Sequence, residues 1–495
     1  VWNVDNCIQC NRCAYVCPHA VIRPIALTEE EAANAPEGMD MIDMIGMPNM
    51  KFSIAVSAYD CTGCGSCANV CPGKKGEKAL VMGNMEANAG RQTFFDYGTE
   101  LPIKPEVVAK FKETTVKGSQ FKQPLLEFSG ACAGCGETPY AKLITQLFGD
   151  RMYIANATGC SSIWGNSSPS TPYTVNPQGR GPAWSNSLFE DNAEFGYGML
   201  LAQNTIRERL KASVEKLVEN GANDDVKAAA QEYLDTFSVG ATNGTATDKL
   251  VKALEDCDCG CAERAELLKN KDFLAKKSQW IFGGDGWAYD IGFGGVDHVL
   301  ASGQDINIMV FDTEVYSNTG GQSSKATKTG ATAQFAAGGK ETKKKDLAGI
   351  AMSYGYVYVA QIAMGADFNQ TVKAIAEAEA YPGPSLIIAY APCINHGIKK
   401  GMSKAQTEEQ LAVECGYWNN FRFNPEAEKK FTLDSKEPKG DYQEFLNGEV
   451  RYNALMRANP EKAQRLFAQN EAEAMERYEY LKGLVNLYDG TAKED

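Results

Sequence analysis

The sequence predicts an α/β protein in which a small, cysteine-rich α+β domain precedes a larger domain built on a parallel sheet, with a helical C-terminal arm. Eight cysteines in two similar runs lie within the first 85 residues. Short apolar segments then alternate with helical patterns from about residue 126 to residue 420. This alternation is typical of a parallel sheet with crossover helices. The remainder of the chain is polar and helical in pattern.

The overall composition limits the possible classes of function. The 495 residues are 44% hydrophobic and 23% charged, which allows roughly two to four domains. The net charge of -14 argues against a nucleic-acid partner, because such proteins present a basic face. No apolar run approaches the roughly 20 residues of a membrane span, so no membrane segment is expected. The chain starts at Val1 and reaches a metal-type motif at Cys7, so we expect a piece of a longer polypeptide.

Four parts can be distinguished along the chain. We expect the cysteine-rich domain at 1–85, with an irregular loop at 28–50, then a linker at 86–125, the sheet domain at 126–420 and the arm at 421–495. Within the sheet domain, apolar runs predict strands at 151–155, 279–283, 305–311, 356–362 and 385–390. Periodic patterns predict helices at 191–220, from 290 onward and at 367–380.

The two cysteine runs share the pattern C-x2-C-x2-C-x3-C-P and form an internal repeat. They are Cys7, Cys10, Cys13 and Cys17 before Pro18, and Cys61, Cys64, Cys67 and Cys71 before Pro72. Such runs hold two [4Fe-4S] clusters, and the fourth cysteine of each run ligates the other cluster. One cluster is therefore expected on Cys7, Cys10, Cys13 and Cys71, and the other on Cys61, Cys64, Cys67 and Cys17. Structural zinc and free thiols are the alternatives, but zinc sites want four cysteines in two pairs.

Four further cysteines stand in loops or at the ends of predicted strands: Cys132, Cys135, Cys160 and Cys393. Spacing alone leaves two interpretations open, a third [4Fe-4S] cluster or buried cysteines without a metal. So many ligand-like cysteines among sixteen imply a reducing, cytoplasmic compartment. A separate run, Cys257, Cys259 and Cys261, is too closely spaced for a cluster. We expect a surface loop there, or an adventitious metal or disulfide site.

A glycine-rich turn, Gly283 to Gly286, follows the predicted strand 279–283. Its glycines allow the backbone to approach a diphosphate closely. Asp285 would repel that diphosphate unless a cation lay between them, and Mg2+ binds carboxylate, carbonyl and phosphate oxygens together. A second set of oxygen ligands is expected one strand later, where the segment 312–320 reads DTEVYSNTG. These two segments together are the signature of thiamine diphosphate enzymes.

One position departs from the usual pattern of those enzymes, which place Asn as the second magnesium ligand. Thr313 occupies that position here, and Val315 supplies the backbone carbonyl. A threonine hydroxyl can ligate Mg2+, so we expect the site to be retained. Asn318 lies too far along the chain to be this ligand. We expect it beside the thiazolium ring or the substrate, as the candidate catalytic residue, and we expect His396 to be structural.

Two more segments, 159–165 (GCSSIWG) and 184–196 (WSNSLFEDNAEFG), complete a family pattern. With 312–320 they resemble the carboxy-terminal part of the pyruvate:ferredoxin (flavodoxin) oxidoreductases, over essentially the whole chain. The resemblance implies a third [4Fe-4S] cluster on Cys132, Cys135, Cys160 and Cys393, and Mg2+ on Asp285, Thr313 and Val315. The residues against thiamine diphosphate would be Glu137, Cys160, Gly284, Asp285, Gly286, Trp287, Thr313, Glu314, Val315, Tyr316, Ser317 and Asn318.

The resemblance also implies an activity. Pyruvate would be decarboxylated oxidatively with coenzyme A to acetyl-CoA and CO2, and electrons would pass through three [4Fe-4S] clusters to ferredoxin or flavodoxin. The family's amino-terminal domains, which bind the pyrimidine side of the cofactor and the substrate carboxylate, are expected upstream or on a partner chain. A homodimer of long chains is expected.

Three rival functions are weighed against this one. A pure electron-relay subunit would not need Asp285, Thr313 and Asn318 intact. A non-oxidative thiamine decarboxylase would need no clusters, so the ligand-like cysteines argue against it. The same chemistry on another 2-oxo acid stays open, although fusion of the ferredoxin-like domain to the cofactor domain favours pyruvate.

Overall fold

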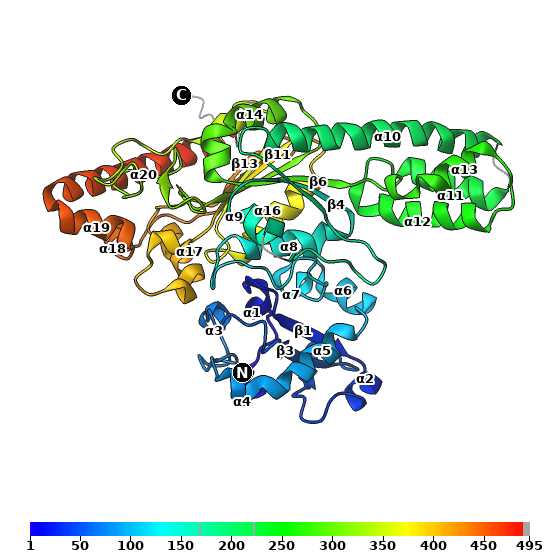
Figure 1. Ribbon diagram of the computed structural model, residues 1–495, viewed down its shortest axis with the longest axis horizontal. Coiled ribbons are helices and arrows are strands. Elements are labelled where there is room, and N and C mark those ends of the chain that lie inside the picture. The colour runs from blue at the N-terminus through cyan, green and yellow to red at the C-terminus, as the bar shows by residue number, and fades with distance from the viewer. Residues whose placement is uncertain (168–169, 221–222, 489–495) are drawn as a thin grey trace.

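The computed structural model describes residues 1–167, 170–220 and 223–488 (Figure 1). Its centre is an eight-stranded sheet in the order β13-β12-β10-β11-β7-β6-β4-β5. Six neighbouring strands are parallel, and β12 and β13 continue the sheet antiparallel. The strands are β4 (Met152–Ala157), β5 (Ala183–Ser187), β6 (Ser278–Gly284), β7 (Asn307–Asp312), β10 (Tyr358–Ile362), β11 (Ser385–Tyr390), β12 (Phe421–Phe423) and β13 (Phe431–Leu433).

Helices cover both faces of this sheet, so its central strands are apolar on both sides. Alternate residues of each strand enter different cores: Ile281 and Ile308 lie in one, and Phe282 and Met309 in the other. The first core includes residues of α10 (Asn192–Asn220), α14 (Phe293–Ala301) and α15 (Leu347–Met352). The second includes residues of α8 (Thr138–Phe148) and α16 (Phe368–Ala380). The predicted strands and helices of this domain are all present, with ends shifted by up to three residues.

The cysteine-rich domain is a three-stranded antiparallel sheet in the order β1-β3-β2, flanked by two short helices. The elements are β1 (Ile22–Leu27), β2 (Ile42–Asp43), β3 (Lys51–Val56), α1 (Arg12–Tyr15) and α3 (Ser66–Val70). Each helix carries the third cysteine of its run. The expectation of an irregular loop at 28–50 was wrong in part. That segment contains β2 and the helix α2 (Glu29–Ala33), which Thr28 and Glu31 close with a capping box.

The segment 86–125, which we expected to be a linker, is folded onto this domain. It contains α5 (Gln92–Glu100), α6 (Pro105–Phe111) and α7 (Val116–Ser119), after the short helix α4 (Met85–Asn88). Phe95 is buried against Ile25 and Ala55, and Phe121 is buried in the core around Phe52. A few apolar side chains in a Lys-rich segment therefore bury themselves against β1 and β3.

The segment after residue 420 is not only helical. Its first part forms β12 and β13, and β12 pairs antiparallel with β10 at the edge of the main sheet. The helices α18 (Tyr442–Asn447), α19 (Val450–Ala458) and α20 (Pro460–Tyr488) follow. Leu466, Phe467 and Leu481 of α20 are buried in the same core as the sheet, so this arm packs on its own chain. α17 (Ala405–Glu414) precedes these elements.

A helical projection extends from the other side of the sheet (Figure 1). The outer part of α10 packs with α11 (Asp224–Asp235), α12 (Gly240–Asp256) and α13 (Ala262–Lys269) around a separate apolar core. No helix of the described residues is both long and apolar enough to cross a membrane.

Lys142 joins the cysteine-rich domain to the sheet domain. It is 1% exposed and donates hydrogen bonds to the carbonyls of Ala14 and Tyr15, the latter at 3.0 Å. We expect Lys142→Met to leave the buried Tyr15 carbonyl unsatisfied, while the Ala14 carbonyl keeps its bond from the Cys17 amide, and to destabilise this junction by about 2 kcal/mol. Hydrogen exchange of the amides at 12–17 in the cluster-loaded protein should speed up. Lys252→Met, on the exposed face of α12, is the control. Equal exchange in the two variants would contradict the assignment.

Candidate functional site

The candidate site residues gather along one edge of the sheet. Asp285 follows β6, Thr313 follows β7, Cys160 follows β4 and Cys393 follows β11, and these strands are neighbours in the order β11-β7-β6-β4. Parallel strands present their carboxyl ends at the same edge, which is where open α/β sheets bind ligands. Residues separated by more than 200 positions in the chain therefore meet at one place.

The three expected magnesium ligands converge. The Thr313 hydroxyl lies 3.0 Å from Oδ1 of Asp285 and 3.1 Å from the carbonyl oxygen of Val315. Asp285 is 1% exposed, and its other oxygen accepts a hydrogen bond from Ser324 at 2.6 Å. Among the described ion pairs none includes Asp285, and burial together with the nearby Asp312 raises the pKa of its carboxyl group well above the ordinary value. A buried carboxylate among oxygen donors, without a cationic side chain of its own, fits a Mg2+ ion.

The glycine-rich turn packs directly on the second metal-binding segment. A Cβ atom at Gly286 would lie 2.4 Å from the ring of Tyr316, so only glycine allows this approach. The Tyr316 hydroxyl also donates to the Gly286 carbonyl at 3.3 Å. Trp287 is fully buried beneath the turn, and a Cβ atom at Gly283 would lie 2.3 Å from its ring. Trp287 and Tyr316 therefore hold the turn in place, and its backbone remains available to a diphosphate.

Glu314, between Thr313 and Val315, is held in a left-handed conformation with φ at 60°. It is fully buried, and its carboxylate lies 2.8 Å from Arg451 and 3.1 Å from Lys344. Burial alone would raise the pKa of Glu314, but the two cations hold it well below its ordinary value. The Tyr417 hydroxyl donates to it at 2.5 Å. Because backbone strain of this kind costs about 1–3 kcal/mol, the charged contacts must hold the conformation that presents the Val315 carbonyl.

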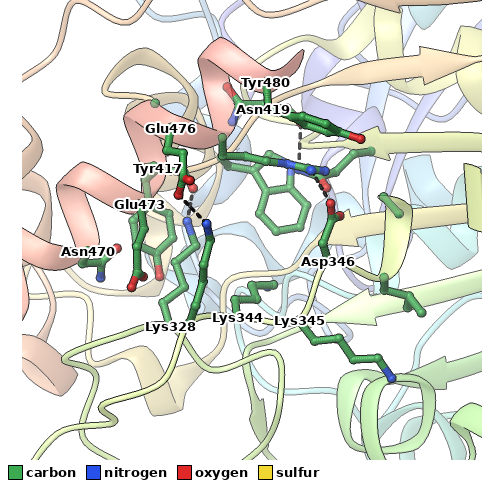
Figure 2. A pocket seen from close by; sticks show the side chains of 18 of the residues that line it. Lys328, Lys344, Lys345, Asp346, Tyr417, Asn419, Asn470, Glu473, Glu476 and Tyr480 are labelled. Carbon is green, nitrogen blue, oxygen red and sulfur yellow. Dashed lines mark hydrogen bonds and ion pairs between the residues drawn. The ribbon is translucent and has the colours of Figure 1, made fainter. Parts of the chain in front are cut away.

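A cavity of about 300 Å3 lies beside this charged network, between the 328–348 segment and α20. Figure 2 shows Lys328 extending toward Tyr417 at its wall, while Lys345 points away. The cationic side chains around it are already engaged. Lys344 pairs with Asp312 and Glu314, and Lys343 pairs with Glu476 at 2.6 Å. These lysines therefore act mainly to neutralise buried carboxylates and to anchor α20.

The third cysteine set is Cys132, Cys135, Cys160 and Cys393. It lies beside the segment 312–320, which carries the expected magnesium ligands Thr313 and Val315 and is called the metal-binding loop below. The pKa of the Cys160 thiol is raised by burial first, and then by Glu137 and the charges of Cys393, Cys135 and Cys132. Each of these side chains is thus close enough to act on Cys160. Burial also raises the pKa of Cys393, opposed by a hydrogen bond from the Ser317 hydroxyl.

Ser317 connects this cysteine set to the metal-binding loop. Its hydroxyl lies 2.7 Å from the Thr313 hydroxyl and also contacts the Cys393 thiol. Asn395 reinforces the junction by donating to the Ser317 carbonyl at 3.2 Å. One side chain therefore touches both an expected magnesium ligand and an expected cluster ligand.

Glu137 and His396 are both buried in this region. Trp164 donates to Glu137 at 2.7 Å, and burial raises the pKa of Glu137 to about 7 despite that bond. His396 lies 2.7 Å from the carbonyl oxygen of Thr313 through Nε2, so it positions the metal-binding loop as a structural residue. Asn318 is exposed in the turn between β8 (Val315–Tyr316) and β9 (Gln322–Ser323). Its catalytic role stays a prediction.

The crossed cluster ligation of the eight repeat cysteines stays a prediction: neighbouring charges link members of each expected group, and Cys13 is also influenced by Cys67 of the other group. The pKa of Cys10 is raised by burial and by the charges of Cys7 and Cys71. That of Cys67 is raised to about 12 by burial and by Cys17, Cys64 and Cys61. Among the described residues, no three His, Cys, Asp or Glu side chains are close enough together to hold a single metal ion. A four-iron cluster is larger than such an ion and needs its ligands farther apart.

The junction between the domains lies next to two of these cysteine groups. His19, two residues after Cys17, lies 3.0 Å from the carbonyl oxygen of Ala131, next to Cys132. Asn69 of α3 donates to the Ser403 carbonyl at 2.8 Å. A short, hydrogen-bonded contact therefore lies between two cysteine sets. One is the expected group Cys61, Cys64, Cys67 and Cys17, and the other is the set Cys132, Cys135, Cys160 and Cys393.

The sequence did not reveal the three side chains that hold Glu314. Lys344, Arg451 and Tyr417 approach Glu314 from a loop, from α19 and from the turn after α17. Nothing in the local sequence marks them, because Lys344 lies in a run of lysines and Arg451 in an ordinary amphipathic helix.

Two family models match the chain. Residues 265–389 match "Thiamine pyrophosphate enzyme, C-terminal TPP binding domain", and residues 6–75 match "4Fe-4S dicluster domain". The chain thus contains a thiamine diphosphate-binding domain and a two-cluster [4Fe-4S] domain.

Several relatives match nearly the whole chain. A pyruvate-flavodoxin oxidoreductase of Enterobacter agglomerans and a pyruvate:ferredoxin oxidoreductase of Moorella thermoacetica are each 56% identical over 98% of this chain and 42% of their own length. A pyruvate dehydrogenase [NADP(+)] of Cryptosporidium parvum is 46% identical over 100% of this chain and 28% of its own length. The chain therefore spans about two fifths or less of these relatives.

We expect Arg451→Met to leave Glu449 buried without its cation and Glu314 with Lys344 as its remaining ion-pair partner. Removing one partner of a buried ion pair costs roughly 3–5 kcal/mol, so the thermal midpoint should fall clearly in the cofactor-free protein. Arg465→Met is the control, because Arg465 is exposed and lies 3.9 Å from Glu341. Midpoints that fall equally in both variants would show that the charged network does not stabilise this loop.

We expect Thr313→Val to weaken Mg2+-dependent binding of thiamine diphosphate about tenfold or more, because the change keeps the shape and removes one oxygen donor. Calorimetric titration at several Mg2+ concentrations measures this effect. Thr319→Val, in the exposed turn, should bind as the parent does, and Thr313→Asn should retain most of the affinity. Unchanged affinity in Thr313→Val would remove this hydroxyl from the metal site.

Proposed function

Because this chain matches part of the pyruvate:ferredoxin (flavodoxin) oxidoreductases along 98% of its length, we propose that it carries the cofactor-binding and electron-transfer part of such an enzyme. The reaction is the oxidative decarboxylation of pyruvate with coenzyme A to acetyl-CoA and CO2. Ferredoxin or flavodoxin accepts the electrons. Since the chain spans 42% of these relatives, the rest of the enzyme supplies the remaining substrate contacts.

The observation that carries this proposal is the Ser317 junction. A hydroxyl that contacts both Thr313 and Cys393 places the expected magnesium site next to the third cysteine set. A thiamine enzyme without redox chemistry has no use for such a cysteine set, and an electron relay has no use for the metal-binding loop. The adjacency favours a reaction in which electrons leave the cofactor directly.

The roles of the residues follow from their positions. Asp285, Thr313 and the Val315 carbonyl hold Mg2+, and the backbone from Gly284 to Trp287 receives the diphosphate. When bound, thiamine diphosphate takes up the electrons left by departing CO2, and [4Fe-4S] clusters accept electrons one at a time. Tyr316 and Trp287 fix the turn, while Glu314 and His396 hold the backbone on either side of Thr313 and keep the ligands oriented.

The domain junction supports an electron path. A cluster held by Cys132, Cys135, Cys160 and Cys393 would accept electrons from the cofactor. A cluster held by Cys61, Cys64, Cys67 and Cys17 would come next, because the contact between His19 and Ala131 joins the two regions. A cluster held by Cys7, Cys10, Cys13 and Cys71 would then serve the external acceptor. None of the sixteen cysteines is in a disulfide bond, and twelve of them form cluster-type sets, which supports a reducing, cytoplasmic setting.

The exposed apolar side chains around the site support a larger assembly. Phe335 is 94% exposed, and Ile394, Leu188 and Ile291 are each more than half exposed. Ile394 follows Cys393 directly, Leu188 follows β5, and Ile291 lies just after the glycine-rich turn. The amino-terminal part of the enzyme covers this edge, within a homodimer. Another 2-oxo acid as substrate is the second candidate, since the residues that contact the carboxylate lie elsewhere.

Electron paramagnetic resonance of the complete, anaerobic enzyme tests the proposal. Pyruvate with coenzyme A should give signals of reduced [4Fe-4S] clusters, with release of CO2 and formation of acetyl-CoA. Cys393→Ser should remove one cluster from the iron count and stop cluster reduction while thiamine diphosphate still binds, whereas Cys415→Ser should behave as the parent. Reduction by another 2-oxo acid but not by pyruvate would change the substrate. Failure of every 2-oxo acid to reduce a fully loaded enzyme would leave only the relay.

A further inference from the structure

Three cysteines have no role in the site described above. Cys257, Cys259 and Cys261 occupy the loop between α12 and α13, in the helical projection that extends away from the sheet (Figure 1). Cys257 is 4% exposed in the core of that projection, while Cys259 and Cys261 are partly exposed. Cys415, the other cysteine outside the cluster sets, is buried elsewhere, and burial raises its pKa to about 12. The loop is therefore the one group of neighbouring thiols left over among the sixteen.

The two outer thiols face each other. The sulfur atoms of Cys259 and Cys261 lie 2.9 Å apart, and a disulfide needs about 2.05 Å. Gly260 lies between them, and a Cβ atom there would meet no atom within 4 Å, so this residue can adjust without obstruction. The amide of Cys259 donates to the Cys257 sulfur at 3.3 Å. The buried third thiol thus holds the loop while the other two approach each other.

The two facing sulfurs are electrostatically unequal. Hydrogen bonds from the Cys261 thiol, the Cys261 amide and the Cys257 thiol lower the pKa of Cys259, and Arg264 adds to this effect. The pKa of Cys261 is raised, because its thiol donates to Cys259. Cys261 is the N-cap residue that precedes α13, and the positive end of this helix favours a thiolate on the neighbouring Cys259 once Cys261 is protonated. Cys259 is therefore the nucleophile, and Cys261 keeps its proton until the second step of the exchange.

We propose that Cys259 and Cys261 form a reversible thiol–disulfide site that exchanges with small disulfides. The Cys259 thiolate attacks one sulfur of a disulfide RSSR, whose S–S bond breaks to release a thiolate that takes up a proton. Cys261 then loses its proton and attacks the Cys259 sulfur, which forms the Cys259–Cys261 bond and releases a second thiol. Two electrons and two protons pass to RSSR, which becomes two RSH.

A metal site on the three thiols is the alternative interpretation of the same loop. The loop lies on a different part of the chain from the carboxyl edge of the sheet, within a separate core. Its oxidation state can therefore change without removing any cluster ligand.

The test uses the complete, cluster-loaded enzyme, equilibrated anaerobically with reduced and oxidised glutathione at a series of ratios. Free thiols are then alkylated with N-ethylmaleimide, and the peptide carrying residues 257–261 is analysed by mass spectrometry. We expect this peptide to lose two hydrogens and two labels together, with Cys259 joined to Cys261, along a single two-electron curve. Cys257 should stay a thiol and be labelled after unfolding. The iron content should stay constant throughout.

Variants separate the two roles. Cys261→Ser should stop at the first step and carry one glutathione on Cys259, whereas Cys259→Ser should carry far less. Cys257→Ser should still close the disulfide, and Cys415→Ser is the matched control. Labelling of both outer thiols at every ratio would overturn the proposal, as would equal glutathione uptake by the two serine variants. Protection from label that requires added zinc and is reversed by a chelator would assign the loop to metal binding instead.

Discussion

Concentrated negative charge at the carboxyl edge of the sheet is the constraint on which this structure depends. Asp285, Asp312 and Glu314 are each at most 1% exposed and lie within a few residues of the ends of β6 and β7. Buried carboxylates are costly unless they are paired. Lys344 and Arg451 neutralise Asp312 and Glu314, which leaves Asp285 with hydroxyl partners alone. A Mg2+ ion at Asp285 would balance this carboxylate and also bind a diphosphate, so charge balance and cofactor binding would be one requirement.

The supporting charges explain why the last part of the chain returns to the sheet. Arg451 comes from α19, Tyr417 follows α17, and the helix α20 packs over the loop that carries Lys344. Because these groups contact Glu314 rather than any ligand, their effect on the site is indirect. They hold a backbone conformation that an isolated loop would not keep. The arm thus packs on the sheet domain, and its Arg451 reaches Glu314 at the carboxyl edge.

The two domains are joined where, in the proposed function, electrons cross. The contacts of Lys142, His19 and Asn69 fasten α1, the end of the first cysteine run and α3 to the sheet domain. Electron transfer between clusters needs short, fixed distances, and buried hydrogen bonds maintain these better than a mobile linker would. The helices at 92–119 serve the same end, because they cover β1 and β3 instead of separating the domains.

The sequence by itself determined which cofactor domains this chain contains and the class of its fold. The spacing of the cysteine runs predicts crossed cluster ligation, the glycine turn with Asp285 and Thr313 predicts a metal-bound diphosphate, and the strand–helix alternation predicts the parallel sheet. These are local patterns, and local spacing limits which atoms can share a ligand. Only the tertiary structure decided that Ser317 joins the metal-binding loop to Cys393 and that Arg451 and Lys344 hold Glu314. Such contacts depend on how distant segments pack, for which a chain carries no periodic or spacing signal.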